Sequence, residues 1–211
     1  MNTTKRIVTP GELITDQRKK LGDNIYIKEN KIYSSVLGIL NESDDYVSVV
    51  ALNGPYLPRV GDGVIGIVKN VTQVGYVIDI KTNQDCFFPK SLLTKELTKG
   101  QMLFARVKST NDSVDLENIN ILPKGNLISV SSVKIPRIIG KNESMLNVLK
   151  NNTESNILVG KNGWIWYVSK NPVLLENAIN LITTNSQKSN LTNTVEEYLK
   201  KSKVDKKWVQ D

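Results

Sequence analysis

The sequence predicts a multidomain chain of β and α/β parts: a small N-terminal β-domain, a five-stranded β-barrel and a C-terminal α/β module. Three observations support this prediction. Short apolar runs bounded by Gly, Asn and Pro fill the first part of the chain, as in strands joined by tight turns. From about residue 123 the apolar spacing becomes that of helices mixed with strands. The length of 211 residues suits two or three small domains better than one large core.

The first segment, residues 1–57, contains few recognisable strands. Residues 32–40 and 46–52 are rich in β-forming side chains, and the polar stretch 41–45 between them is typical of a turn. A further short strand is expected over residues 12–15. Because a sheet of so few strands is only marginally stable alone, we expect this domain to be stabilised by contacts with its neighbours.

The second segment, residues 58–122, predicts a small barrel. Its apolar runs are short and are separated by Gly and Asn turns. The expected strands cover residues 64–71, 75–80, 85–88, 101–108 and 114–118. Five short strands of this kind are typical of an OB-like barrel, a fold whose second and third strands often bind oligonucleotides.

The third segment, residues 123–185, combines strands with helices. A strand over 127–130 precedes two helical stretches, the second starting near Ser144. Two strands follow, over 156–159 and 164–168, and a last helix begins at Pro172, a favoured residue for the first helical turn. The resulting order, β-α-α-β-β-α, is that of a KH domain.

The last segment, residues 186–211, is a polar, Lys-rich tail. Residues 194–201 are expected to form a helix with Thr194 as its N-terminal cap and acidic residues in its first turn. A tail of this composition can order on a partner.

The composition excludes several kinds of chemistry. The chain has no histidine and one cysteine, Cys86, so an intrachain disulfide, a zinc site of thiolates and imidazoles, and Ser-His-Asp or Cys-His catalysis are all excluded. We expect Cys86 to be a half-buried strand residue, and we expect no catalytic residue, metal or cofactor. No apolar run approaches the ~18 residues of a membrane span, and the N-terminus lacks a secretory signal. A cytoplasmic protein without a membrane partner is expected.

The positive charge is concentrated in two segments. The net charge is +7. Residues 58–108 hold eight Lys/Arg and four Asp/Glu, and residues 124–185 hold seven and three. Such segments attract phosphate-bearing partners through Coulomb forces and counterion release, although a basic surface that serves only solubility would have the same composition.

The barrel carries the residue types that bind a single-stranded nucleic acid, which are aromatic rings for stacking and cations along the backbone path. The candidate RNA contacts on or beside its strands are Lys69, Tyr76, Phe88, Lys90, Arg106 and Lys108, and Lys81 lies at a strand end. Because side chains alternate along a strand, Phe87 and Phe88 face opposite ways and only one of them can stack on a base. The alternative is that these aromatic residues belong to the core.

Two groups of motifs resemble known RNA-binding modules. Residues 60–68 and 75–80, followed by Phe88-Pro89-Lys90-Ser91-Leu92-Leu93 and Lys99-Gly100-Gln101, resemble an S1 domain. In a KH domain a G-x-x-G loop approaches the phosphates, and the matching loop here, with its neighbouring arginine, offers Arg137, Gly140, Lys141 and Asn142 as RNA contacts. Its fourth position is Glu143, whose side chain and charge oppose a phosphate, so a mainly structural KH module is favoured.

The whole order of domains resembles the exosome RNA-binding cap subunits of the ribosomal-RNA-processing-protein-four type. The resemblance is sharpest at residues 135–141 with 144–146 and at residues 159–166. The second stretch holds the G-x-N-G signature of that family, here Gly160, Asn162 and Gly163, followed by Trp164. The resemblance implies a structural role for this signature, against the S1 domain. The Asn-Gly pair also suits a primed hairpin turn.

The resemblance implies a non-catalytic adaptor. Such subunits bind single-stranded RNA and pass its 3′ end to a hexameric ring of RNase PH-like subunits, with three copies on each ring and with contacts from the N-terminal domain and the C-terminal segment. Three alternatives stay open: a purely structural subunit of the same complex, a free-standing S1/KH translation factor, and an enzyme acting through acidic residues such as Asp112, Asp115 and Glu117. The last is disfavoured because those residues resemble loop charges rather than a metal site.

Overall fold

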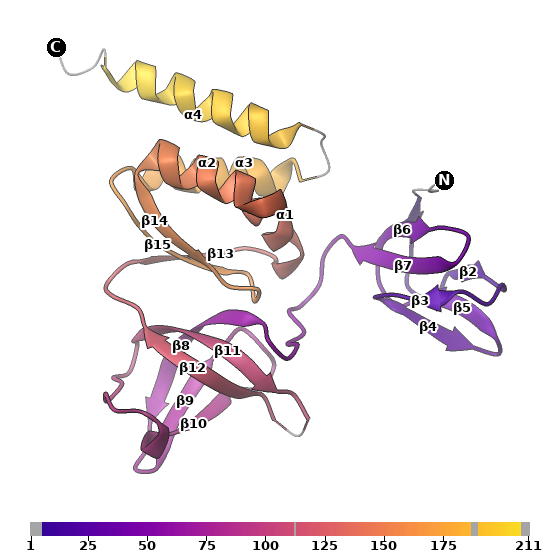
Figure 1. Ribbon diagram of the computed structural model, residues 1–211, viewed down its shortest axis with the longest axis horizontal. Helices are drawn as coiled ribbons and strands as arrows, with labels where there is room; N and C mark the ends of the chain where they lie inside the picture. Colours follow the sequence, from indigo (N-terminus) through magenta and orange to yellow (C-terminus); the bar gives the residue numbers. More distant parts are fainter. Residues whose placement is uncertain (1–5, 112, 187–189, 208–211) are drawn as a thin grey trace. The chain divides into compact units, whose positions relative to one another are not determined.

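The chain divides into two compact units, Met1–Pro55 and Tyr56–Asp211 (Figure 1). The structure, a computed structural model, describes residues 6–111, 113–186 and 190–207, with side chains as far as Ser202. Asp112 and part of the tail, both named in the sequence predictions, therefore lie outside the described residues.

The N-terminal unit contains seven short strands in two sheets. The strands are β1 (Ile7–Val8), β2 (Leu13–Thr15), β3 (Lys20–Leu21), β4 (Ile25–Lys28), β5 (Lys31–Ser34), β6 (Gly38–Glu42) and β7 (Tyr46–Ala51). One sheet has the order β1-β6-β7-β3 and the other β2-β5-β4. Val8, Ile32, Leu40, Val47 and Val49 form a buried core between them. The expectation of few strands is therefore wrong, because seven short strands occur where three were expected.

The predicted strand over residues 32–40 is in fact two strands. The buried Ser34 interrupts it, because its Oγ donates to the carbonyl of Val36 at 2.7 Å and closes a local turn. At the start of the second strand, a Cβ on Gly38 would lie 2.4 Å from Val49 Cγ1, so a larger residue would push the two strands apart. A run of β-forming residues alone did not reveal this break.

The barrel segment forms one antiparallel five-stranded sheet, as predicted. Its strands are β8 (Gly63–Val71), β9 (Gly75–Asp79), β10 (Cys86–Pro89), β11 (Met102–Ser109) and β12 (Asp115–Ile121), in the order β10-β9-β8-β11-β12. A short 3₁₀ turn, Lys90–Leu92, follows β10. The edge strands β10 and β12 also contact each other, so the sheet curves into a half-barrel. This arrangement is consistent with an OB-like domain.

The α/β module has the predicted order of elements. It contains β13 (Asn126–Ser129), α1 (Ile135–Ile139), α2 (Ser144–Thr153), β14 (Ser155–Val159), β15 (Trp164–Ser169) and α3 (Pro172–Thr184), with 3₁₀ turns at Ser132–Lys134 and Lys141–Glu143. The sheet order is β13-β15-β14, and the helices cover one face of the sheet (Figure 1). Ile138, Leu149, Ile165 and Leu175 are among its fully buried core residues.

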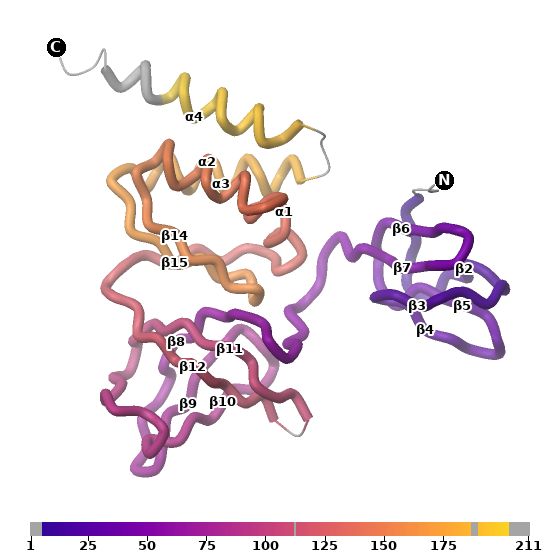
Figure 2. Tube along the Cα trace, viewed as in Figure 1, coloured from indigo at the N-terminus to yellow at the C-terminus, as the bar shows by residue number. Residues whose placement is uncertain are grey.

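The tail adds a helix to this module. Helix α4 (Leu191–Lys207) lies along α2 and α3 (Figures 1 and 2). It begins three residues earlier than predicted, so Thr194 lies inside the helix and does not cap it. Leu191, Val195 and Leu199, spaced four residues apart on one face, are buried in the module core. The described part of the tail is thus folded onto the chain itself.

Candidate nucleic-acid interface

The exposed aromatic ring on the β10 side of the barrel is that of Phe87. Its side chain is 47% exposed and lies opposite Val77 of β9 in the strand register. The ring also covers Gly75, where an added Cβ would lie 2.4 Å from Phe87 Cζ. Phe87 therefore offers a free aromatic face on the two strands that often bind oligonucleotides in OB folds.

Tyr76 and Phe88, the predicted stacking residues, are buried, with 1% and 5% of their surface exposed. Both belong to the barrel core together with Cys86. The Tyr76 hydroxyl accepts a hydrogen bond from the backbone N–H of Leu97 at 3.2 Å. Their rings cannot stack on a base in this fold, so these two predictions are wrong. The cause is the alternation along β10, which puts Cys86 and Phe88 inside and Phe87 outside.

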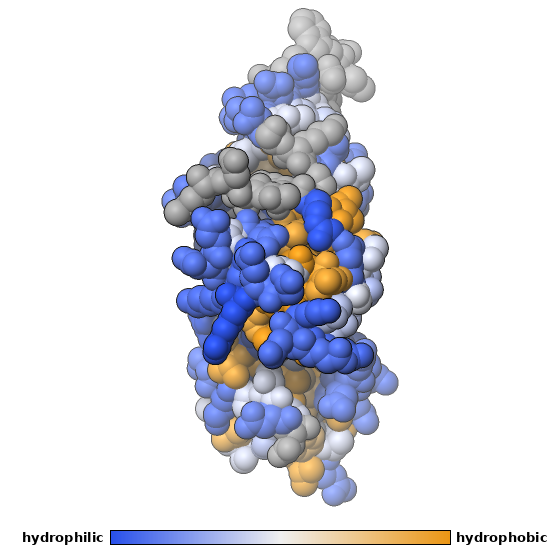
Figure 3. Space-filling view, turned by 90° about the vertical axis from the view of Figure 1, so that its right-hand side faces the viewer, coloured by the Kyte–Doolittle hydropathy of each residue, from blue (hydrophilic) through white to orange (hydrophobic). Residues whose placement is uncertain are grey.

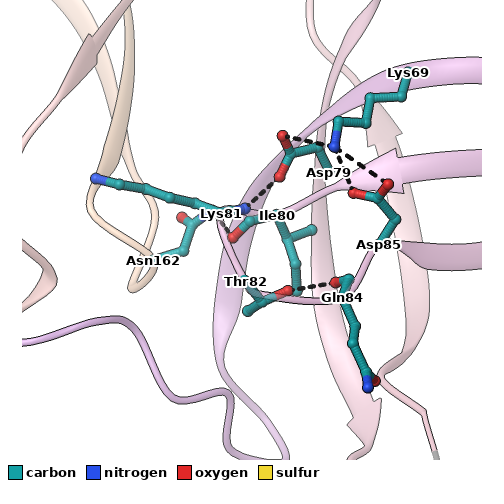
Figure 4. A network of polar contacts seen from close by, with 8 residues as sticks. All are labelled: Lys69, Asp79, Ile80, Lys81, Thr82, Gln84, Asp85 and Asn162. Atoms are coloured by element: carbon teal, nitrogen blue, oxygen red, sulfur yellow. Dashed lines mark hydrogen bonds and ion pairs between the residues drawn. The ribbon is translucent and has the colours of Figure 1, made fainter.

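Lys69 is matched by two carboxylates (Figure 4). Its ammonium donates to Asp85 Oδ1 at 2.9 Å and lies 3.6 Å from Asp79 Oδ2. The hydrogen bond to Asp85 is the main reason that the pKa of Lys69 is raised. Its charge is thus balanced within the barrel, which weakens the predicted attraction for a phosphate.

Lys81 joins the barrel to the α/β module rather than facing a ligand. Its amine donates to Ser129 Oγ at 2.8 Å and to the carbonyl of Val130 at 2.6 Å. Partial burial lowers the pKa of this amine. The prediction that counted Lys81 among the cations at strand ends missed this role.

The other predicted cations of the barrel are spread along it. Arg106 and Lys108 are exposed on β11, where Arg106 donates to the carbonyl of Gly61 at 3.1 Å. Lys90 follows β10, with its ammonium 5.8 Å from the centre of the Tyr76 ring, a cation–π distance. Arg106 lies opposite Gly63, at the start of β8, whereas Lys69 lies near its far end. These residues are therefore spread over the sheet and do not form one cluster.

The loop between α1 and α2 keeps the backbone shape of a glycine-rich turn. Gly140 has φ +75°, and a Cβ there would lie 2.7 Å from the backbone nitrogen of Met145. Asn142 and Glu143 also have positive φ, 50° and 59°. Glu143 thus occupies a left-handed position that glycine fills without strain. Its side chain is exposed and forms no capping hydrogen bond to α2.

Basic side chains of this loop line a groove beside the tail helix. The groove has a volume of about 640 Å³, and Arg137, Lys141 and Ser144 form one wall. Residues 190–193 at the start of α4 form the opposite wall. The predicted contacts Arg137, Lys141 and Asn142 are all exposed at or beside it, and Gly140 is partly exposed. The structure therefore brings this predicted group together.

Asn162 pins the α/β module to the barrel. Its side chain is fully buried, and its Nδ2 donates to the carbonyls of Ile65 at 2.7 Å and Ile80 at 2.9 Å. Its Oδ1 accepts from the backbone N–H of Ile65 at 3.3 Å. The preceding residue, Lys161, also bonds to the barrel, because its backbone N–H donates to the carbonyl of Gly63 at 2.8 Å. The hairpin tip therefore forms hydrogen bonds with backbone groups of the barrel and holds the two parts together.

The glycines of this hairpin allow that close approach. A Cβ on Gly160 would lie 2.8 Å from the backbone nitrogen of Ile65, and one on Gly163 would lie 2.4 Å from the carbonyl oxygen of Val130. Gly163 alone in the loop has a positive φ, 85°. The turn is thus a three-residue type I turn with a left-handed glycine, and not the primed two-residue turn weighed from the sequence.

The tryptophans that follow complete the interface. Trp164 and Trp166 are 9% and 3% exposed and pack with Ile65 of the barrel, and Phe104 lies against the same cluster. They are interface residues, so their rings are not available to stack on a base.

Comparison with known proteins shows which protein family the chain is similar to. The model of the exosome RNA binding protein RRP4 N-terminal domain matches residues 5–53. The exosome complex component Rrp4 of Methanosarcina acetivorans is 36% identical, with 96% of this chain and 85% of that protein covered. The corresponding values are 36%, 84% and 75% for Pyrococcus furiosus Rrp4, and 32%, 94% and 94% for Picrophilus torridus Rrp4.

The chain belongs to the Rrp4 family. A crystal structure described as that of an exosome complex RNA-binding protein matches with a TM-score of 0.65 and 24% identity, over 72% of this chain and 99% of that one, which shows the shared fold. The Rrp4 description is that of an RNA-binding exosome component and not of an enzyme, which confirms the expectation of a non-catalytic subunit.

Three further observations concern metal binding, membrane crossing and the thiol of Cys86. In the part of the chain that the structure describes, no three His, Cys, Asp or Glu side chains gather closely enough to hold a metal ion. None of the described helices has the length and apolar character needed to cross a bilayer. Cys86 is 1% exposed rather than half-buried, and burial raises the pKa of its thiol to about 12.

Proposed function

We propose that this Rrp4-family chain is a non-catalytic cap subunit that captures single-stranded RNA and passes its 3′ end to a ring-shaped 3′→5′ exoribonuclease. In this proposal the five-stranded sheet is an S1-type barrel and the α/β module is of KH type. The ring is a hexamer of RNase PH-like subunits that carries three copies of the chain. Membership of the Rrp4 family supports the exosome part of the proposal.

The observation that carries the RNA-binding part is the exposed ring of Phe87. A base can stack on this ring without any rearrangement of the barrel, and stacking on an aromatic residue contributes about 1–3 kcal/mol per base. The cations of β11 and the groove beside the α1–α2 loop then lie along the same compact unit as phosphate contacts. Because such contacts read no base edges, the binding is largely independent of sequence.

Fluorescence anisotropy with a labelled oligouridylate tests this function. Phe87→Ala should weaken binding about tenfold, whereas Val173→Ala, which truncates an apolar side chain 65% exposed on α3, should leave the affinity unchanged. Affinity of the native chain should fall steeply between two salt concentrations, because each phosphate contact releases counterions. Absent or salt-independent binding, both in the free chain and in its ring complex, would overturn the proposal.

A purely structural role in the same complex is the second candidate. The pairing of Lys69 and the burial of Tyr76 and Phe88 favour it, because they remove three predicted RNA contacts. If Phe87→Ala, Arg106→Ala and Lys108→Ala leave both RNA binding and RNA degradation by the complex unchanged, the role of the chain is structural only.

A further inference from the structure

The N-terminal unit has an outward sheet face that carries both aromatic rings and cations. We call it the tyrosine face, and its members on β2, β4 and β5 are Leu13, Tyr26, Lys28, Lys31 and Tyr33. On the opposite face of these strands, Ile32 is buried and Ile25 packs against the core. Alternation along the strands therefore turns the tyrosine face away from the core.

The rings on this face form a row that is open at one end. Tyr33 lies opposite Leu13 on one side and Tyr26 on the other. The rings of Tyr26 and Tyr33 are stacked, with centroids 5.5 Å apart and planes 19° from parallel. Among the described strands, β4 pairs with β5 alone, so no neighbouring strand covers the outer side of Tyr26. Its side chain is 41% exposed, and a planar base can extend the row there.

Two lysines face each other beside these rings. Lys28 and Lys31 are direct partners in the register of β4 and β5, and both are exposed. Within the described ranges neither ammonium forms an ion pair, and Glu29 in the intervening turn makes none with them either. Like charges directly opposite each other destabilise a sheet. An anion held between the two ammonium groups would remove that cost.

The spacing of rings and cations suits a nucleotide. Each lysine lies two residues along its strand from a tyrosine on the same face, which is about 7 Å at the rise of a β-strand. One nucleotide spans this distance from base to phosphate. Figure 3 shows exposed apolar side chains among polar ones on one side of the molecule. The tyrosine face combines stacked rings with two lysines that form no ion pair within the described residues.

We propose that the tyrosine face is a second binding surface for single-stranded RNA, separate from the barrel. One base stacks on Tyr26, and the adjoining phosphate lies between Lys28 and Lys31. This inference rests on the proposed function in that both assign single-stranded RNA as the ligand. It adds a contact in a unit of the chain to which the sequence assigned only a contact with the ring.

The test compares full-length variants by anisotropy with the same oligouridylate. Tyr26→Ala should lower the affinity about tenfold, the value of stacking one base, whereas Tyr26→Phe keeps the ring and should bind like the native chain. Lys28→Gln with Lys31→Gln should reduce the slope of log affinity against log salt by about 0.7 for each phosphate that is no longer neutralised. Ultraviolet crosslinking of thiouridine-containing RNA should label Tyr26.

The outcomes separate this inference from the proposed function. If the native chain binds RNA and Phe87→Ala weakens that binding, while Tyr26→Ala binds normally and no crosslink maps to β4, the tyrosine face is not an RNA surface. If Tyr26→Ala loses assembly with the ring but keeps its RNA affinity, the face binds protein and the inference is overturned. If the native chain binds no RNA, both proposals fail.

Discussion

Asn162→Ala should break the junction between the barrel and the α/β module. The variant removes three hydrogen bonds that the Asn162 amide makes with the backbone of Ile65 and Ile80. A typical hydrogen bond contributes about 1 kcal/mol net, and buried groups left without a partner cost more. The side chain is fully buried, so water cannot replace these bonds without rearrangement. We expect the free energy of unfolding to fall by about 3 kcal/mol.

Urea denaturation followed by tryptophan fluorescence measures this decrease. Trp164 and Trp166 lie in the same interface, and a Trp208→Phe background would restrict the signal to them. The matched control is Asn156→Ala, which truncates an exposed asparagine on the neighbouring strand β14 and should change stability by less than about 0.5 kcal/mol. A decrease for Asn162→Ala below about 1 kcal/mol, or equal to that of the control, would refute the pinning role.

Three further predictions concern single positions. Glu143→Gly should raise RNA affinity more than Glu143→Gln, because only glycine also relieves the left-handed backbone and opens the loop to a phosphate; equal affinities, measured by anisotropy, would contradict this. Lys69→Ala should weaken RNA binding less than Lys108→Ala, since Asp85 already matches the Lys69 charge; the reverse order would show that the ion pair opens on binding. Burial raises the pKa of the Cys86 thiol from 9.0 to about 12, so the stability that the neutral thiol contributes should be lost as pH rises through that interval. Native protein at about pH 8 should resist alkylation until urea unfolds it, and rapid alkylation of the folded chain would argue against a buried thiol.

Local sequence signals predicted the elements of the barrel and of the α/β module, but not which of their side chains are buried and which are exposed. Residues 86–88 are Cys-Phe-Phe, so every position is apolar and either face of β10 could be the buried one. The neighbouring strands decide, because Cys86 and Phe88 pack with the interior residues of β8 and β11. The exposed Phe87 could not be identified without that packing.

The tail shows a signal that was present but missed. Leu191, Val195 and Leu199 recur every four residues, which is the spacing of a buried helix face. The helix expected over residues 194–201 rested instead on a capping residue and on acidic residues, and the polar composition suggested that it orders on a partner. In the structure these three side chains join the core of the α/β module, so amphipathic spacing was the better guide than average polarity.

The sequence by itself determined the order of strands and helices in the barrel and the α/β module, the exclusion of histidine and disulfide chemistry, and the glycine-rich hairpin around Asn162. These features depend on residues close together in the chain or on residue types that are missing from it. Only the tertiary structure decided which aromatic ring faces solvent and which lysines are paired. Lys69 meets Asp85 across the sheet and Lys81 meets Ser129 across the junction with the module. Such contacts join residues far apart in sequence, so the packing of strands sets them and local pattern does not.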